Sequence, residues 1–118
     1  MKRIELFEKV NRENLKEFGV NIKVLIAYWS SMDAENDMID FDGVIWDKEI
    51  EDIAKCMNDN GITEFTISST FSSLTETLAG FEKNGFKVVG LTEINTRYTD
   101  FDGNRKKAPA ILMKKGGN

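Results

Sequence analysis

The chain has 118 residues, of which 41% are hydrophobic and 31% charged, and its formal net charge is −4. This length fits one compact domain with a single core, and the composition is that of a folded protein, not a disordered one. The longest apolar run, Val24 to Trp29, is far shorter than the roughly 20 residues that a membrane-spanning helix needs. We therefore expect a single cytoplasmic domain over residues 1–118 that does not associate with a membrane.

The chain contains no histidine and a single cysteine, Cys56. Without histidine, the usual serine and cysteine nucleophile chemistries lack their general base, and most zinc sites lack a ligand. One cysteine cannot form an internal disulfide, so we interpret Cys56 as part of the core. We expect no catalytic residues, no bound metal and no cofactor.

Acidic residues are concentrated in the first half of the chain. Residues 33–59 hold ten acids against two lysines, Lys48 and Lys55. The simplest interpretation is a solvated helical surface. The alternative is an acidic face that binds a basic surface of a partner protein, and such a face repels nucleic acid. We therefore expect a protein partner with a basic surface, and no direct binding of DNA or RNA.

Three helices are predicted in the N-terminal half. The first covers residues 3–18 and ends at Gly19, and the third covers about 47–59 and ends at Asn60-Gly61. The second runs from Asn21 to about residue 36, because apolar residues there follow i, i+3, i+4, i+7 spacing, although alternation leaves a strand possible. Its expected inward positions are Ile22, Leu25, Ile26, Trp29 and Met32.

The C-terminal half predicts the order strand, helix, strand, strand. The expected ranges are 62–69 for the first strand, 73–84 for a helix with a Ser73/Glu76 capping box, and 86–98 and 107–114 for the last two strands.

These elements predict an α/β (α+β) fold with a three-stranded mixed sheet packed with four helices. A strand, helix and strand in sequence form a right-handed crossover, so the strands at 62–69 and 86–98 should be parallel neighbours. The last strand should then close a hairpin. Its only proline, Pro109, lacks an amide donor, which predicts a place at the sheet edge. The chain would comprise a helical part at 1–59 and a strand-helix-strand-strand part at 62–114.

The tetrapeptide DFDG occurs twice, at residues 40–43 and 100–103. Asp-Gly between two strand-like runs is a strong hairpin signal, so the second copy predicts the turn of the C-terminal hairpin, with Asp100 facing Arg105. We interpret the first copy as a turn before the third helix. The repeat is thus expected to reflect turn chemistry used twice, with phenylalanine as the anchor.

The first copy also permits two readings as a functional motif. It resembles the nucleophile motif of haloacid dehalogenase-type phosphatases, which implies a magnesium-dependent phosphatase using Asp40 and Asp42. A calcium loop nearly fits as well, with Glu49 at its twelfth position, but Met38 stands where the first carboxylate is required.

The serine-rich stretch SSTFSS, residues 68–73, lies between a predicted strand and a predicted helix. Free amides and hydroxyls at such a junction bind anions in α/β proteins, although ordinary helix capping explains them equally well. A small anion or nucleotide sensor using Ser69, Ser72 and Ser73 is therefore a further alternative. For all these hypotheses together, the candidate binding residues are Ser69, Thr70, Ser72, Ser73, Asp40, Asp42, Asp47, Glu49, Tyr98 and Asp100.

Four sequence blocks carry a more specific resemblance: EFTISSTFSSL at 64–74, GLTE at 90–93, YTDF at 98–101 and PAI at 109–111. With these blocks the chain is similar, over more than half its length, to small proteins carried by conjugative and phage-like mobile elements of Firmicutes. The resemblance implies a bacterial cytoplasmic accessory protein of a mobile element and supplies no catalytic residues. Our leading hypothesis is a non-enzymatic protein that acts by binding a host or element-encoded protein. By association, the resemblance implies an inhibitor of host defence of anti-CRISPR or anti-restriction type.

Overall fold

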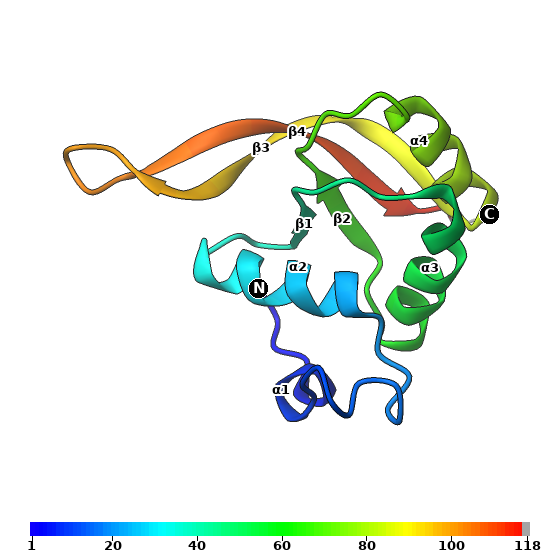
Figure 1. Cartoon of the computed structure of the whole chain (residues 1–118). Helices are drawn as coiled ribbons and strands as arrows, with labels where there is room; N and C mark the ends of the chain where they lie inside the picture. Colours follow the sequence, from blue (N-terminus) through cyan, green and yellow to red (C-terminus); the bar gives the residue numbers. More distant parts are fainter. Residues whose placement is uncertain (117–118) are drawn as a thin grey trace.

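The computed structural model describes residues 1–116 and shows a four-stranded mixed sheet with helices packed around it (Figure 1). The mixed α+β class and the four helices are confirmed. The sheet has a fourth strand, β1, which was not predicted because it is only three residues long. No helix in this part of the chain is long and apolar enough to cross a membrane. In chain order the elements are α1 (Glu5–Lys9), α2 (Ile22–Asp33), β1 (Ile39–Phe41), the 3-10 helix η1 (Asp47–Glu49), α3 (Ile50–Asp59), β2 (Glu64–Ile67), α4 (Leu74–Lys83), β3 (Phe86–Thr99) and β4 (Arg105–Lys115).

The strand order is β1-β2-β4-β3, with β1 parallel to β2 and β4 antiparallel to both of its neighbours. β2 and β3 therefore run parallel, as expected, but the prediction that they are adjacent is wrong because β4 lies between them. The central place suits β4 because it carries the buried residues Ala110 and Met113, whereas β3 is exposed along much of its length.

The expectation that Pro109 marks an edge strand is also wrong, since β4 is central. Pro109 lies opposite Glu93 of β3, beyond the end of β2, whose last residue Ile67 is opposite Ile111. At Pro109, β4 has only β3 beside it. A proline is tolerated there because its missing N–H removes no bond to β2.

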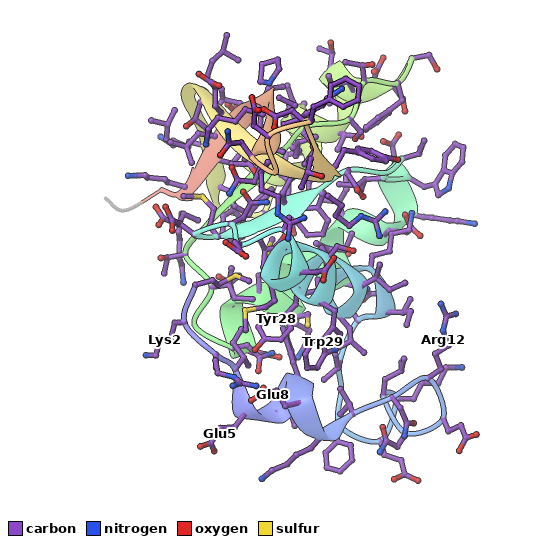
Figure 2. The ribbon with its side chains drawn as sticks, turned by 90° about the vertical axis from the view of Figure 1, so that its left-hand side faces the viewer. Lys2, Glu5, Glu8, Arg12, Tyr28 and Trp29 are labelled. Atoms are coloured by element: carbon purple, nitrogen blue, oxygen red, sulfur yellow. The ribbon has the colours of Figure 1, made fainter. Side chains whose placement is uncertain are left out.

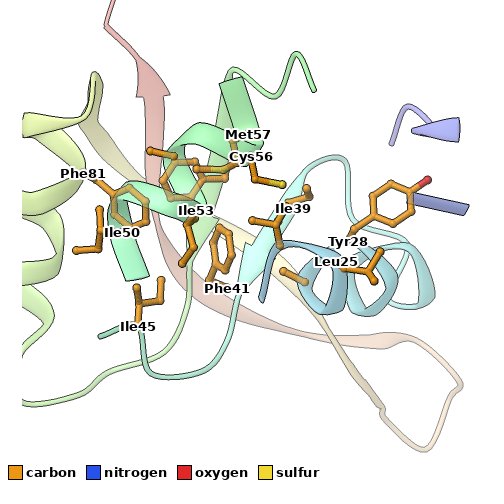
Figure 3. Close-up of a cluster of buried hydrophobic side chains, with 14 of the residues drawn as sticks. Leu25, Tyr28, Ile39, Phe41, Ile45, Ile50, Ile53, Cys56, Met57 and Phe81 are labelled. Carbon is orange, nitrogen blue, oxygen red and sulfur yellow. The ribbon is translucent and has the colours of Figure 1, made fainter. Parts of the chain in front are cut away.

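Aromatic side chains form the centre of the core. The ring of Phe65 on β2 contacts Phe41, Phe81 and Phe86 at centroid separations of 5.4, 4.9 and 5.3 Å. Such aromatic pairs add about 0.5–1.5 kcal/mol each beyond the burial of their area. Figure 3 shows that α3 contributes to the same cluster through Ile50, Ile53, Cys56 and Met57.

The start of α2 is determined by Asn21, whose side chain accepts hydrogen bonds from the N–H groups of Lys23 and Val24. An N-cap of this kind stabilises a helix by about 1 kcal/mol. The helical prediction for this segment is confirmed, and the strand alternative is excluded.

The buried face of α2 matches the predicted one only in part, since Leu25 is buried as predicted. Val24, Tyr28 and Ser31 point inward, whereas Ile26 and Trp29 are 46% and 42% exposed. This segment is apolar on several sides, so its pattern does not determine which side is buried.

Tyr28 connects α2 to the N-terminal segment, towards which it points in Figure 2. Its ring meets Phe7 edge to face at 5.2 Å, and its hydroxyl accepts a hydrogen bond from the N–H of Ile4 at 2.9 Å. The first helix is much shorter than the predicted 3–18 because Val10 is extended, and turns occupy the residues that follow it.

Candidate functional site

A polar cleft of about 280 Å³ lies where the carboxyl ends of β1 and β2 meet the end of α2 and the base of the β3–β4 ribbon. The carboxyl ends of parallel strands are a common location for ligand sites. Four of the predicted site residues come together here: Asp40, Asp42, Ser69 and Tyr98.

Asp40 lies at one side of the cleft and is only 7% exposed. Its two carboxylate oxygens accept hydrogen bonds from the hydroxyls of Thr66 at 2.7 Å and Ser68 at 2.6 Å. Its N–H donates to the Ser31 hydroxyl on α2 at 2.9 Å. Burial raises the pKa of Asp40, although the Ser68 and Thr66 hydroxyls oppose that shift. Asp40 thus joins β1 to β2 and to α2, which is a structural role.

Asp42 has a different environment, although it belongs to the same tetrapeptide. It is exposed and makes no hydrogen bond or ion pair within residues 1–116. It lines both the polar cleft and a neighbouring apolar hollow of about 200 Å³ beside Ile26 and Val44. Its carboxylate is therefore available to a ligand.

Tyr98 and Arg97 form the opposite wall, on β3. The pairing of β3 with β4 shifts register between Asn95 and Thr99, so this part of the strand bulges. Tyr98 remains 73% exposed. The bulge presents an aromatic ring and a guanidinium at the rim of the cleft.

Arg105 fixes the base of the ribbon to the end of α2. Its guanidinium donates to the carbonyl oxygens of Asp33 at 2.7 Å and Arg97 at 3.2 Å. A cation at a helix C-terminus is favourable because the last carbonyls carry partial negative charge. Arg105 thereby fixes the position of β3 relative to the end of α2, on the two sides of the cleft.

A second attachment comes from Asn36, in the loop between α2 and β1. Its side chain accepts from the N–H of Asn95 at 2.7 Å and donates to the C=O of the same residue at 2.9 Å. The backbone of β3 is thus bonded to this loop through both of its polar groups. Neither Asn36 nor Arg105 was predicted, because contacts between residues 59 and 72 positions apart leave no local signal.

The serine-rich stretch is divided between two places. Ser69 lines the polar cleft and donates to the carbonyl of Gly43 at 2.8 Å. Ser72 and Ser73 lie with Asp47 in a shallow hollow of about 630 Å³ beside Trp46 and Lys48.

The remaining predicted site residues lie outside the cleft. Thr70 is exposed and has no hydrogen bond in the described residues. Ser73 is the N-cap of α4, but its side chain accepts no capping bond, so the predicted capping box is wrong. Glu49 forms an ion pair with Lys23 at 3.0 Å and accepts from the N–H of Trp46 at 2.9 Å. These contacts give Glu49 a structural role.

Asp100 lies in the hairpin turn, where its carboxylate accepts from the N–H groups of Asp102 and Asn104, each at 2.9 Å. The hairpin prediction is confirmed, and Gly103 has the positive φ of 83° that such a turn requires. The expected contact of Asp100 with Arg105 is wrong, because Arg105 reaches α2 instead.

The two DFDG copies therefore share turn residues but not an environment. The first copy begins inside β1, with Phe41 buried, whereas Phe101 of the second copy is fully exposed and anchors nothing. Trp46, downstream of the first copy, is 55% exposed.

The calcium loop that the first copy nearly fits is not assembled. Asp40 is bonded within the sheet and Glu49 to Lys23, so neither is directed at a common point with Asp42. In the described residues, no group of three or more histidine, cysteine or acidic side chains is arranged to hold a metal ion.

The acidic residues of segment 33–59 form two groups instead of one face. Figure 1 shows the end of α2 and the helix α3 on opposite sides of the molecule. The first group comprises Asp33, Glu35 and Asp37, and α3 with the preceding turn carries Asp47, Glu51, Asp52 and Asp59. Asp42, in the cleft, is separate from both.

Comparison with known sequences adds one finding. The family model for a domain of unknown function (DUF7698) matches residues 23–115, which include almost all of α2 and every element from β1 to β4, so the chain belongs to this family. No curated protein and no solved structure matches it.

Proposed function

We propose that this member of the DUF7698 family is a non-enzymatic binding protein whose polar cleft receives a basic side chain of a partner protein. The observation that carries the proposal is that Asp42 and Tyr98 line the same cleft, and neither side chain makes a hydrogen bond or ion pair within residues 1–116; only the backbone of Tyr98 is bonded, to the Thr96 hydroxyl. A carboxylate pairs with a guanidinium or ammonium, and an aromatic face attracts the same cation.

The β3–β4 ribbon supplies further contact area. Figure 1 shows it projecting beyond the rest of the sheet. Phe101 is fully exposed at its turn, and Tyr98 lies at its base. Exposed aromatic residues are enriched in the buried centres of protein interfaces. A partner in the cleft could therefore also cover the ribbon.

The resemblance to proteins of mobile elements supports a cytoplasmic partner in a bacterial host. Host-defence proteins that hold nucleic acid carry basic channels, which electrostatically favour an acidic binding protein. An inhibitor of that class is the specific form of our proposal.

Capture from host lysate tests the proposal, with the wild type compared with Asp42→Asn and Tyr98→Ala. Asp59→Asn is the matched control, because Asp59 is exposed and acidic but lies on α3, paired with Lys55. We expect one or more basic proteins on the wild type and the control, and loss of at least tenfold on Asp42→Asn. Equal capture by all four proteins would remove the cleft from the proposal.

A magnesium-dependent phosphatase using Asp40 and Asp42 remains an alternative. The hydrogen bonds of Thr66 and Ser68 to Asp40 weigh against it, since a nucleophilic carboxylate needs an oxygen directed at phosphorus. Turnover of a generic phosphate ester with magnesium, lost in Asp40→Asn that is still folded, would establish the phosphatase instead.

A second candidate, a small anion or nucleotide sensor, is favoured by Arg97, which lines the cleft together with Ser68 and Ser69. A guanidinium with two hydroxyls suits a phosphate group. Asp42 opposes that ligand by charge. The two candidates thus require ligands of opposite sign at one place.

A further inference from the structure

We propose that the free edge of β3 pairs with the same edge of a second copy of the chain, which forms an antiparallel two-fold dimer with one continuous sheet. The proposal concerns residues 86–93 and does not depend on the cleft or its ligand. It follows from the unpaired backbone groups, the exposed side chains and the charges along this edge.

Within residues 1–116, one edge of the sheet is open. β3 has β4 on one side and no strand on the other. At the opposite edge, β1 is covered by α2, and the outward N–H of Asp40 donates to the Ser31 hydroxyl. Pairing through β3 therefore stops at two copies, because each copy has a single free edge.

The hydrogen bonds of Asn36 show which backbone groups of β3 face outward. Both polar groups of Asn95 bond to Asn36, so they point away from β4. In an antiparallel ladder this direction repeats every second residue, and the register is regular from Leu91 to Asn95. The N–H and C=O of Leu91 and Glu93 therefore also point outward, where no residue of the described chain bonds them.

The side chains along this edge are apolar and exposed. Val88, Val89 and Leu91 are 42%, 55% and 80% exposed. Between them lies Gly90, which has no positive φ, and a Cβ placed there would meet nothing within 4 Å. β3 shifts register between Val88 and Gly90, and glycine is common at such a bulge, so the folded monomer itself accounts for this residue.

Charges at the two ends of the edge are complementary. One end carries the exposed lysines Lys87 and Lys115, and at the other Glu93 lines a hollow together with Glu35 and Asp37. An antiparallel arrangement centred near Gly90 brings the basic end of each copy to the acidic end of the other. The two-fold symmetry of such a dimer forms the contact between a basic and an acidic end twice. This favours a second copy of the chain over an unrelated strand as the partner.

Sedimentation velocity of the full chain over a concentration series tests the proposal. We expect the wild type to form a dimer. Leu91→Pro removes an outward N–H that the monomer does not use, so dimerisation should weaken at least about tenfold while the fold persists. Phe101→Ser changes an exposed residue at the hairpin turn, away from this edge, and should leave the dimer unchanged.

A charge exchange provides an independent test that does not alter the backbone. Lys87→Glu and Glu93→Lys should each weaken self-association, because each places like charges together twice in the dimer. An equimolar mixture of the two variants should form a heterodimer, since it restores one attractive contact at each end. A monomeric wild type at every concentration, or a dimer that survives both Leu91→Pro and the charge variants, would overturn the proposal.

Discussion

Replacement of Asp40 by alanine should destabilise the fold strongly. The change leaves the Thr66 hydroxyl, which is fully buried, without its acceptor, and removes a second bond from Ser68. An unsatisfied buried group costs about 1–3 kcal/mol, and a hydrogen bond to a charged group contributes about 1.5–3 kcal/mol. Removal of a buried carboxylate offsets part of this loss, so we expect a net decrease of about 2–4 kcal/mol in the free energy of unfolding.

Chemical denaturation of wild type, Asp40→Ala and Asp42→Ala measures the effect. Asp42 is exposed and unbonded within residues 1–116, so its replacement should change the free energy of unfolding by no more than about 0.5 kcal/mol. The denaturant dependence, or m value, should be the same for all three proteins. Equal effects of the two substitutions would refute the structural role of Asp40.

Three further outcomes are expected. The first concerns pH. The pKa of Asp40 is raised above the ordinary 3.8, so the folded state retains this proton to a higher pH than the unfolded state does. The free energy of unfolding of the wild type relative to Asp40→Asn, measured by denaturation at a series of pH values, should therefore be greatest at low pH and fall as the pH rises through the raised pKa. Asn36→Ala should accelerate hydrogen exchange at the Asn95 amide and destabilise the chain by about 1–2 kcal/mol, since two hydrogen bonds are lost. Gly103→Ala should lower the free energy of unfolding by about 1–2 kcal/mol because its φ is positive, whereas Gly43→Ala should have little effect in the same thermal or denaturant assay.

Most signals that act over a few residues were predicted well, although the capping box at Ser73 was not. Asn21 caps α2 through its own side chain, and Gly61 and Gly85 adopt positive φ directly after α3 and α4. Such caps depend on the conformation of one turn, so the local sequence contains the information. The hairpin turn at Gly103 belongs to the same class.

Features that depend on distant contacts were predicted less well. β1 has three residues and is a strand only because β2 lies beside it. The central place of β4 is determined by which strand buries more apolar surface, and periodicity along one strand does not rank strands in this way. The inward face of α2 is likewise determined by partners such as Phe7, which contacts Tyr28.

The candidate site was predicted in part. Asp40 and Asp42 were identified, but not their different roles. Asp40 lies within β1 and bonds to β2 and α2, whereas Asp42 follows the end of this strand and is exposed. Side chains alternate between the two faces of a strand, which separates Thr66 from Phe65 and Ile67, so the hydroxyl partner of Asp40 was detectable in principle. The contributions of Asn36, Arg97 and Arg105 depend on how the ribbon meets α2, for which the sequence contains no local pattern.

The proposed function is tested most directly by nuclear magnetic resonance titration of the folded chain with two small probes of opposite charge, a capped arginine and inorganic phosphate. We predict that the arginine shifts the amide signals of Asp42, Ser69 and Tyr98, and that Asp42→Asn abolishes these shifts while phosphate causes none at the cleft. Binding of phosphate at these residues without binding of the arginine would contradict the proposal and establish an anion site instead.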